Sequence, residues 1–464
     1  MLRATYKTNT LLRRPLSTLA PNSANSANSA LATTSAALAG NMTPVSGWLT
    51  LVLPSSILAI IHIGGLTRLT KSGLSMTDWS LTGEKFPQDD AEWEAEFSRY
   101  KLFPEFSQRQ AMTLSEFKMI FYYEYGHRMM GRTIGVLYLV PAFAFAALRK
   151  IPPGYGPRIA LIGAMGGTQG LVGWWMVKSG LGEDRRNDKS EIRVDPKRLA
   201  THLGMALATY VVCLSTGLKM MFDGGLAGTA GAAGAAGAAG AAGAAGAAGL
   251  KKIEVSPRAH KLLSLIYRKS AVVTALAFTT AVSGALVSGQ DAGNSHNYWP
   301  HFDEYYEDDR NSTSNTRIDN NNKDKHNSDA LIRRWAPSSY FDASSYGGSF
   351  FRKFTEDGSS VQFNHRMLAY ATVGGAVGLG FLGQRARAFG VIKQHFPKVT
   401  TGASAVGLLS LTQMSLGITT LLHNVPMPLA AAHQMGSLAV ITAGTYTAVV
   451  GREAVKRIVV RAAK

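Results

Sequence analysis

The sequence predicts an all-α polytopic membrane protein with eight transmembrane helices arranged as two tandem four-helix bundles. Three observations support this prediction: apolar segments of about 20 residues, motifs that recur in both halves, and an asymmetric distribution of charge. Hydrophobic residues make up 46% of the 464 residues, although long polar connectors lower the mean hydropathy. The predicted spans are 45–66, 129–148, 157–177, 199–221, 270–289, 366–383, 402–422 and 429–450.

The first 40 residues are expected to be a mitochondrial transit peptide. They contain Arg3, Lys7, Arg13 and Arg14 among many Ser, Thr, Ala and Asn residues, and no acidic residue occurs before Asp78. No apolar core follows the basic residues, as it would in a secretory signal peptide. A disordered basic tail is the alternative interpretation, and in either case this segment is excluded from the fold.

The segments 45–221 and 270–450 repeat the same motifs in the same order. The first predicted span of each half ends in a Gly-containing turn, and three further motifs match between the halves. These are Gly126-His-Arg-Met-Met with Asn364-His-Arg-Met-Leu, Ala200-Thr-His-Leu-Gly with Ala431-Ala-His-Gln-Met-Gly, and Thr168-Gln-Gly-Leu-Val-Gly with Thr412-Gln-Met-Ser-Leu-Gly. The repeat predicts a duplicated four-helix unit with a ligand site inside each bundle.

Connectors of biased composition separate these units. The segment 222–269 contains Gly-Ala-Ala repeats from Gly231 to Gly249, and we expect a flexible linker because Gly at every third position disfavours a helix. An insert at about 303–330 is rich in Asp, Asn and Lys and is expected to be disordered. The single cysteine, Cys213, lies in an apolar segment, which excludes disulfides and thiolate metal sites within one chain.

Eight spans place both termini on one side, and the charges identify that side. The connectors and ends assigned to it, including the basic tail 451–464, carry 23 basic and 3 acidic residues, against 25 and 27 elsewhere. This is the positive-inside pattern, which predicts both termini in the matrix of the mitochondrion. The basic residues are spread over many connectors instead of forming one patch, so nucleic-acid binding is not expected.

Four histidines are candidate metal ligands, because each lies at the start of a predicted span that begins on the outer side. A histidine in a membrane segment is costly unless it is paired or ligating. Neutral imidazole is a strong axial ligand of haem iron, and facing helices of a bundle can hold a haem. We therefore expect one haem in each half, near the intermembrane space, held by His127 with His202 and by His365 with His433. Taken singly, each could instead be a hydrogen-bonded core residue.

Charged residues beside these histidines differ between the halves. Glu124 lies three residues before His127 and shares its helix face. In the second half the equivalent is taken to be Val361, in Val361-Gln-Phe-Asn-His365, so that half has no carboxylate there. The asymmetry predicts chemistry in the first half and a permanent cofactor in the second. Alternatively, Glu124 caps a helix or pairs with Arg128. The side chains expected to contact haem propionates, or simply to extend to the interface, are those of Arg128, Arg132 and Arg366.

These motifs resemble the haem A synthase family of the mitochondrial inner membrane, which serves the assembly of cytochrome oxidase. The resemblance covers most of 45–450, and it departs from the family after Gly293, where the polar insert replaces a short aromatic segment. The matching stretches are Gly64 to Trp79, Glu116 to Arg128, Gly170 to Gly180, Val361 to Arg366, and the segment around His433.

The resemblance implies that the chain oxidises the C8 methyl group of haem O to a formyl group, using oxygen and external electrons. It implies that His127 and His202 bind the substrate haem, that Glu124 is a catalytic carboxylate, and that His365 and His433 bind a resident haem b. It further implies haem O synthase as the supplier of substrate and a ferredoxin with its reductase as the electron source. Contact with membrane lipid is expected, and a homo-oligomer is left open.

Three other classes of protein share some of these features. A cytochrome b561-like diheme electron carrier also holds two haems between histidines, but it would not need Glu124 and the turn from Thr67 to Trp79, which occur in one half only. A haem chaperone would keep the histidines and make Glu124 dispensable. A repeat-based transporter is disfavoured because both halves have the same orientation and no broken helix pair is evident.

Overall fold

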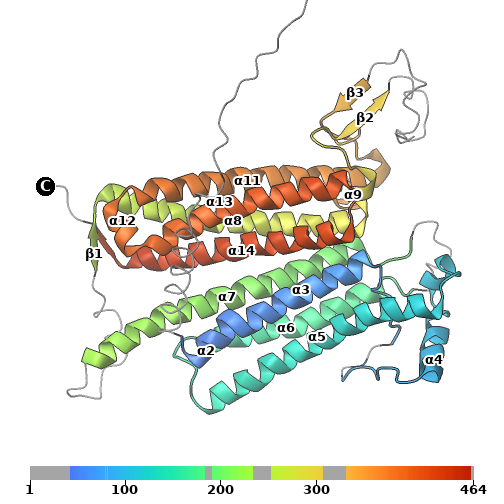
Figure 1. The fold of residues 1–464 in the computed structure, drawn as a ribbon, viewed down its shortest axis with the longest axis horizontal. Helices are drawn as coiled ribbons and strands as arrows, with labels where there is room; N and C mark the ends of the chain where they lie inside the picture. Colours follow the sequence, from blue (N-terminus) through green and yellow to red (C-terminus); the bar gives the residue numbers. More distant parts are fainter. Residues whose placement is uncertain are drawn as a thin grey trace, which may run out of the picture.

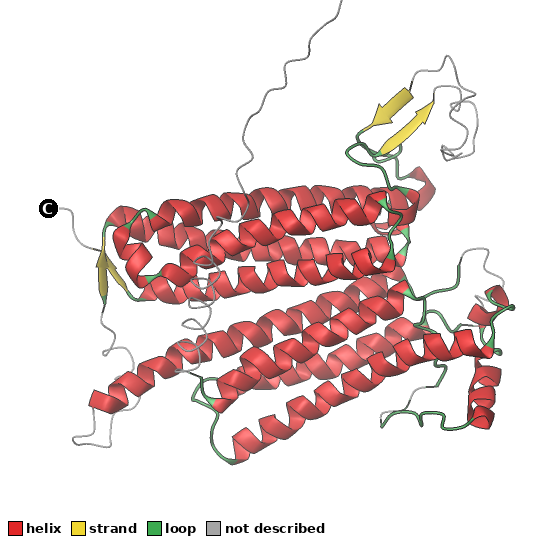
Figure 2. Ribbon diagram, viewed as in Figure 1, coloured by secondary structure: helices red, strands yellow, loops and turns green. Residues whose placement is uncertain are grey.

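The computed structural model describes residues 42–78, 80, 82–182, 191–233, 252–306 and 331–460. The predicted transit peptide, most of the Gly-Ala-Ala repeats, residues 307–330 of the insert and the last four residues of the basic tail lie outside the described residues. In the described ranges the chain is predominantly helical, with two short two-stranded sheets (Figure 2).

The long helices of the first half lie side by side in the lower part of Figure 1. The first is continuous through α2 (Pro44–Gly47), a π-helical turn at Trp48–Val52, and α3 (Leu53–Leu69). It is followed by α5 (Leu114–Ala147), α6 (Gly156–Lys178) and α7 (Pro196–Ala233). α3 contacts α5 and α7, and α6 contacts the same two helices. α5 and α7 therefore face each other across this group.

The second half repeats this arrangement in the upper part of Figure 1. Its long helices are α8 (Pro257–Gly289), α11 (Gly358–Arg387), α13 (Pro397–Leu422) and α14 (Met427–Lys456). α8 and α13 each contact both α11 and α14. In the figure α5, α7, α11 and α14 all begin at the right-hand end, as expected for a repeat whose halves have the same orientation.

Six helical segments in the described residues are long and apolar enough to cross a membrane. They are Pro44–Leu69, Leu114–Ala147, Pro196–Asp223, Pro257–Gly289, Gly358–Arg387 and Pro397–Leu422. The chain is thus a multi-pass helical membrane protein. α6 and α14 fall outside this set, so the prediction of eight spans in two bundles stays a prediction.

Two helices begin more than ten residues before the predicted spans. α5 begins at Leu114 instead of 129, because Thr113 accepts the backbone N–H of Glu116 while the Glu116 side chain accepts that of Thr113, a capping box. α8 begins at Pro257 instead of 270, with the Ser256 hydroxyl as its cap. Both added segments contain charged residues, which excluded them from an apolar window.

The shorter elements lie at the two ends of the long helices. On the right-hand end lie α4 (Asp90–Tyr100), a 3₁₀ turn at Pro104–Gln108, α9 (Ala292–Ser295), a second 3₁₀ turn at Ser344–Tyr346 and α10 (Phe350–Glu356), with α12 (Gly390–His395) at the opposite end (Figure 1). β2 (Asp303–Tyr306) pairs antiparallel with β3 (Leu331–Arg334). Disorder was therefore the wrong prediction for 303–306, because these residues have a partner beyond the insert. β1 (Ile253–Val255) pairs parallel with β4 (Ile458–Val460).

The two halves pack through α3 and α7 against α8 and α14. A buried apolar cluster that includes Leu207, Leu438 and Ile441 joins them, and the hydroxyls of Tyr210 and Thr442 lie 2.7 Å apart inside it. At the right-hand end Arg68 and Arg193 of the first half both bind the carboxylate of Asp291 in the second half, at 3.0 and 2.6 Å. Because this cluster and these ion pairs cross the boundary, the halves form one packed body.

Candidate functional site

The structure brings the four predicted histidines together in two pairs. The ring centroids of His127 and His202 are 6.5 Å apart, and those of His365 and His433 are also 6.5 Å apart. Two imidazoles that bind one metal from opposite sides, each with a bond of about 2 Å, need about this separation between ring centres. The interplanar angles of 73° and 81° are acceptable, because each ring can rotate about its bond to the metal.

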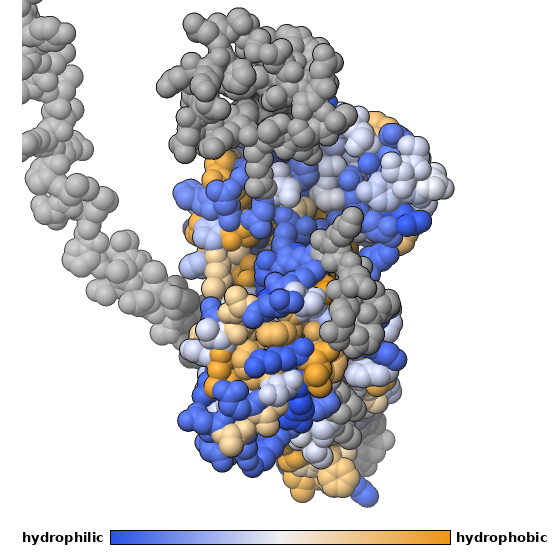
Figure 3. All heavy atoms as spheres, turned by 90° about the vertical axis from the view of Figure 1, so that its right-hand side faces the viewer, coloured by the Kyte–Doolittle hydropathy of each residue, from blue (hydrophilic) through white to orange (hydrophobic). Residues whose placement is uncertain are grey.

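Each histidine is set back from the start of its helix. His202, His365 and His433 lie in the second turn of α7, α11 and α14. His127 lies 13 residues after the first residue of α5, about 20 Å along its axis, because α5 extends beyond α3 towards α4 (Figure 1). The four rings therefore lie towards the right-hand end of the molecule, where hydrophilic residues are spread over both halves (Figure 3).

Each imidazole packs against a glycine of a neighbouring helix. A Cβ atom at these glycines would lie 2.7 to 3.1 Å from Cε1 of the histidine, so any larger residue would displace the ring. The pairs are Gly64 on α3 with His127, Gly173 on α6 with His202, Gly284 on α8 with His365, and Gly417 on α13 with His433. We call these four glycines the histidine sockets.

A glutamine one helical turn before two of the sockets holds the backbone of the paired histidine. Gln169 donates to the carbonyl oxygen of His202 at 2.9 Å, and Gln413 donates to that of His433 at 2.8 Å. In both cases the amide nitrogen also lies 3.0 to 3.1 Å from Nδ1 of the ring. The Thr-Gln motif common to both halves is therefore part of the site.

The composition of each site fits a metal that brings most of its own ligands. No group of three or more His, Cys, Asp or Glu side chains in the described ranges could hold a bare metal ion. Two facing imidazoles complete the coordination of a haem iron, whose other four ligands come from the porphyrin. The residues present thus fit a haem in each half.

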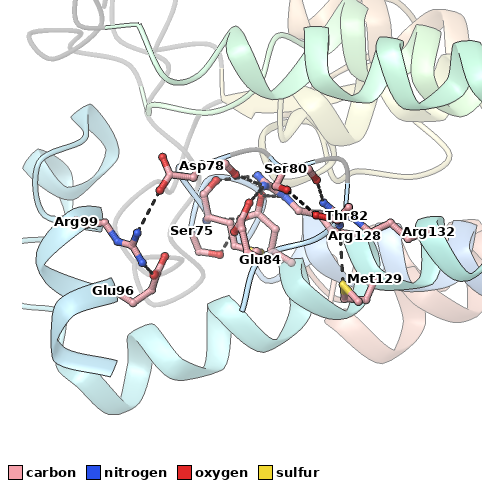
Figure 4. A network of polar contacts seen from close by, with 12 residues as sticks. Ser75, Asp78, Ser80, Thr82, Glu84, Glu96, Arg99, Arg128, Met129 and Arg132 are labelled. Atoms are coloured by element: carbon pink, nitrogen blue, oxygen red, sulfur yellow. Dashed lines mark hydrogen bonds and ion pairs between the residues drawn. The ribbon is translucent and has the colours of Figure 1, made fainter. Parts of the chain in front are cut away.

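Glu124 is buried on α5 and fully engaged in hydrogen bonds (Figure 4 shows its surroundings). Its carboxylate accepts the Ser75 hydroxyl at 2.7 Å, the Met76 backbone N–H at 2.9 Å, and the Arg128 guanidinium at 2.7 Å. It does not cap the helix, because α5 begins ten residues earlier with Thr113 as its cap. The pairing with Arg128 that the spacing allowed is present.

The second half has no counterpart of this carboxylate. The residue three before His365, as Glu124 is before His127, is Gln362 and not Val361, and it is also buried. Its Oε1 atom has no hydrogen-bond partner among the described residues. The predicted asymmetry between the halves therefore holds at the level of side-chain chemistry.

The three arginines bind the connectors that cover the right-hand end. Arg128 donates to the carbonyl oxygens of Met76 and Asp78, both at 2.7 Å, and Arg132 donates to that of Ser80 (Figure 4). In the second half Arg366 donates to the carbonyl oxygens of His296 and His301, at 2.9 and 3.1 Å. These bonds hold each connector against α5 or α11, the helices that carry His127 and His365. Contact with haem propionates stays a prediction.

Sequence reasoning missed the sockets, Ser75, and the function of the two glutamines. A signal for some of them was present, because Gln169 with Gly173 and Gln413 with Gly417 have the same spacing of four residues. Gly64 and Gly284 also occupy matching positions, before Gly65-Leu66 and Ala285-Leu286, but a repeated glycine does not by itself indicate contact with a histidine. Ser75 comes from a connector, whose path across α5 no periodicity predicts.

The chain is similar to proteins of known family over most of its length. The COX15-CtaA family model, described as cytochrome oxidase assembly protein, matches residues 47–445. The human protein named heme A synthase COX15 is 38% identical over 408 residues, which cover 87% of this chain and 81% of that protein. Heme A synthase of Paracoccus denitrificans is 36% identical over 85% of this chain and 84% of its own length.

A third relative combines two functions in its name. The heme A synthase-mitochondrial ferredoxin fusion protein of Schizosaccharomyces pombe is 34% identical over 400 residues, which cover 83% of this chain and 56% of that protein. All three names give the same enzyme activity, heme A synthase.

Proposed function

Because the chain belongs to the COX15-CtaA family of cytochrome oxidase assembly proteins, we propose that it is a haem A synthase, the membrane enzyme that converts haem O to haem A. The observation that carries this proposal is the pair of facing imidazoles in each half, on a chain 36–38% identical to named haem A synthases. The buried Glu124 network in one half favours an enzyme over a diheme electron carrier of the cytochrome b561 kind.

The two pairs of histidines receive different functions in this proposal. His127 and His202 hold the substrate, haem O, beside Glu124, and His365 and His433 hold a resident haem b. The presence of a buried carboxylate near the first pair and of Gln362 near the second supports this division. When bound, the haem groups supply the iron for one-electron and oxygen chemistry.

The chain's own residues orient the substrate and handle its protons. The sockets and the glutamines fix the ring positions, and the connector held by Arg128 covers the first pair and limits the access of water. Glu124 is the group that takes up or passes on a proton as the C8 methyl group becomes a formyl group. The Ser75 hydroxyl donates to Glu124 Oε2, so it is the first group with which Glu124 can exchange that proton.

The membrane arrangement is proposed to include eight spans. α6 and α14 pack along neighbouring spans and have comparable lengths, which supports a crossing by each. With eight spans, the excess of basic residues near the termini supports a location of both termini in the matrix of the mitochondrion. The histidine pairs then lie in the half of the inner membrane nearer the intermembrane space.

Two partners follow from the proposed reaction. Haem O synthase would supply the substrate, because haem O is a hydrophobic molecule made by another enzyme. A ferredoxin, reduced by its reductase, would supply electrons, and the fusion protein of Schizosaccharomyces pombe supports this partner by its name. A homo-oligomer and bound membrane lipid remain part of the proposal.

Extraction of the bound haems from the purified, detergent-solubilised protein tests the proposed function. Chromatography of the extract should give haem B together with haem O, a hydroxylated intermediate or haem A. A reduced-minus-oxidised spectrum of the same sample should show bis-histidine haem. Two equivalents of haem B without any haem O derivative would contradict the proposal and favour the electron carrier.

A further inference from the structure

The two histidine pairs are built alike, yet the hydrogen bonding at Nδ1 of one ring differs between them. We propose that Ser283 is a positioning residue that makes the His365–His433 pair the permanent haem site. We further propose that the isoleucine at the matching position, Ile63, leaves the His127–His202 pair able to release its haem. This inference rests on the proposed function and explains how one chain can keep one haem while it turns over another.

Ser283 and Ile63 occupy the same place relative to the sockets. Ser283 directly precedes Gly284, the socket of His365, and Ile63 directly precedes Gly64, the socket of His127. The two sockets contact Cε1 of their histidines in the same way, at 3.1 and 2.8 Å from an added Cβ. The local frame is therefore repeated, and the side chain before the socket differs.

The Ser283 hydroxyl fixes the proton on the ring of His365. Its oxygen lies 2.8 Å from Nδ1 of His365 and 2.7 Å from the carbonyl oxygen of Thr280. The carbonyl can only accept, so the single hydroxyl proton is donated to Thr280. The hydroxyl oxygen must then accept a proton from Nδ1, which leaves the lone pair of Nε2 free for iron.

His127 has no side-chain partner of this kind. The Ile60 carbonyl of α3 faces the His127 ring, but Nδ1 is buried and forms no hydrogen bond of normal geometry with any described residue. Ile63 cannot provide one, because its side chain has neither donor nor acceptor. The Thr280 carbonyl faces the His365 ring in the same way. The two pairs therefore differ in the Ser283 hydroxyl, which holds Nδ1 of His365 and has no counterpart at His127.

Such a partner strengthens a metal site in two ways. An acceptor at Nδ1 raises the basicity of the coordinating nitrogen and holds the ring in the orientation that the metal requires. Loss of the group that hydrogen-bonds a ligand histidine in this way typically lowers metal affinity about 10- to 100-fold. A more basic ligand also stabilises the ferric state, so its loss raises the reduction potential.

The experiment measures haem affinity at one pair at a time in the full-length protein. A His127→Ala background leaves the second pair to be titrated with haem B, and a His365→Ala background leaves the first. In the first background, Ser283→Ala should weaken haem binding about 10- to 100-fold and raise the reduction potential. Ser283→Thr, which keeps the hydroxyl, should bind haem as the background does.

Two further variants complete the design. Thr279→Ala removes an exposed hydroxyl of the same helix that is bonded only to the carbonyl of Ala275, so it should change neither affinity nor potential. In the His365→Ala background, Ile63→Ser should tighten haem binding at the first pair and slow the transfer of its haem to an acceptor such as apomyoglobin. If Ser283→Ala does not fold, the gain in haem affinity of Ile63→Ser is the measurement that tests the inference.

The outcomes separate this inference from the proposed function. Unchanged haem affinity and potential in Ser283→Ala, or no gain in Ile63→Ser, would overturn the inference while the haem sites stand. A His127→Ala background that binds no haem at all would instead refute the assignment of His365 and His433, and the inference with it.

Discussion

The imidazole of His202 on α7 lies against Gly173 on α6, so closely that a Cβ at that glycine would be 3.0 Å from Cε1. Gly173→Ala should therefore push the ring out of line with His127 and weaken haem binding at the first pair. Gly170→Ala is the matched control, because Gly170 lies in the same helix with nothing within 4 Å of an added Cβ. Both variants are titrated with haem and followed by the bis-histidine spectrum. Equal haem affinity in the two would contradict the assignment of Gly173 as a socket for His202.

Glu124 should be required for turnover but not for haem binding. Glu124→Gln keeps an acceptor for the Ser75 hydroxyl and the Met76 N–H, and it removes the charge that pairs with Arg128. We expect loss of haem A formation with both haems still bound. The measurement is haem A produced by cells that express the variant, and wild-type amounts would sink the catalytic assignment.

Removal of a histidine should affect one haem only. His433→Ala should abolish the resident haem and leave haem at His127 and His202, because the two ring pairs lie in different helix groups. Extracted haem per protein should fall by about half in both His433→Ala and His202→Ala, with haem B lost in the former. A variant with the complete haem content and an unaltered spectrum would show that its histidine is not a ligand.

The segment around Glu105 should become less stable as the pH rises. Burial raises the pKa of this carboxyl to about 7, although Arg109 and the Tyr100 hydroxyl oppose the shift. The folded state therefore holds a proton that the unfolded state releases above about 4.5. This stabilisation is complete below that pH and is lost as the pH rises through about 7.

Hydrogen exchange of the region 90–108, measured at about pH 5.5 and about pH 8 and corrected for the intrinsic rate, checks this prediction. Protection should decrease at the higher pH in the natural protein. Glu105→Gln cannot ionise, so its protection should vary less between the two conditions. A pH dependence that is identical in both proteins would assign the effect to another group.

Hydropathy and the internal repeat were sufficient to predict where the long helices lie. All eight predicted apolar segments correspond to long helical segments, but their ends were missed where charged residues extend a helix, as at Leu114 and Pro257. These starts depend on caps, Thr113 and Ser256, that lie outside any apolar window. The antiparallel pairing of β2 with β3 joins segments on both sides of the insert, which local sequence does not reveal.

The candidate site was likewise predicted only in part from the sequence. The four histidines could be found from sequence because each repeats within a matching motif. The contacts that hold them, such as Gly284 with His365 and Gln413 with His433, join different helices and depend on how those helices pack. Arg128 was predicted to pair with Glu124 or reach a propionate, and its bonds to the carbonyls of Met76 and Asp78 required the path of the connector.

The pairing of β1 with β4 has a consequence for labelling the protein. β1 directly follows the Gly-Ala-Ala linker, and β4 lies four residues before the end of the chain, with Ile253 opposite Ile458. Labels attached directly beside Ile253 and Ile458 would thus be neighbours. A circularly permuted second half, closed through these strands, would also need only a short connecting peptide.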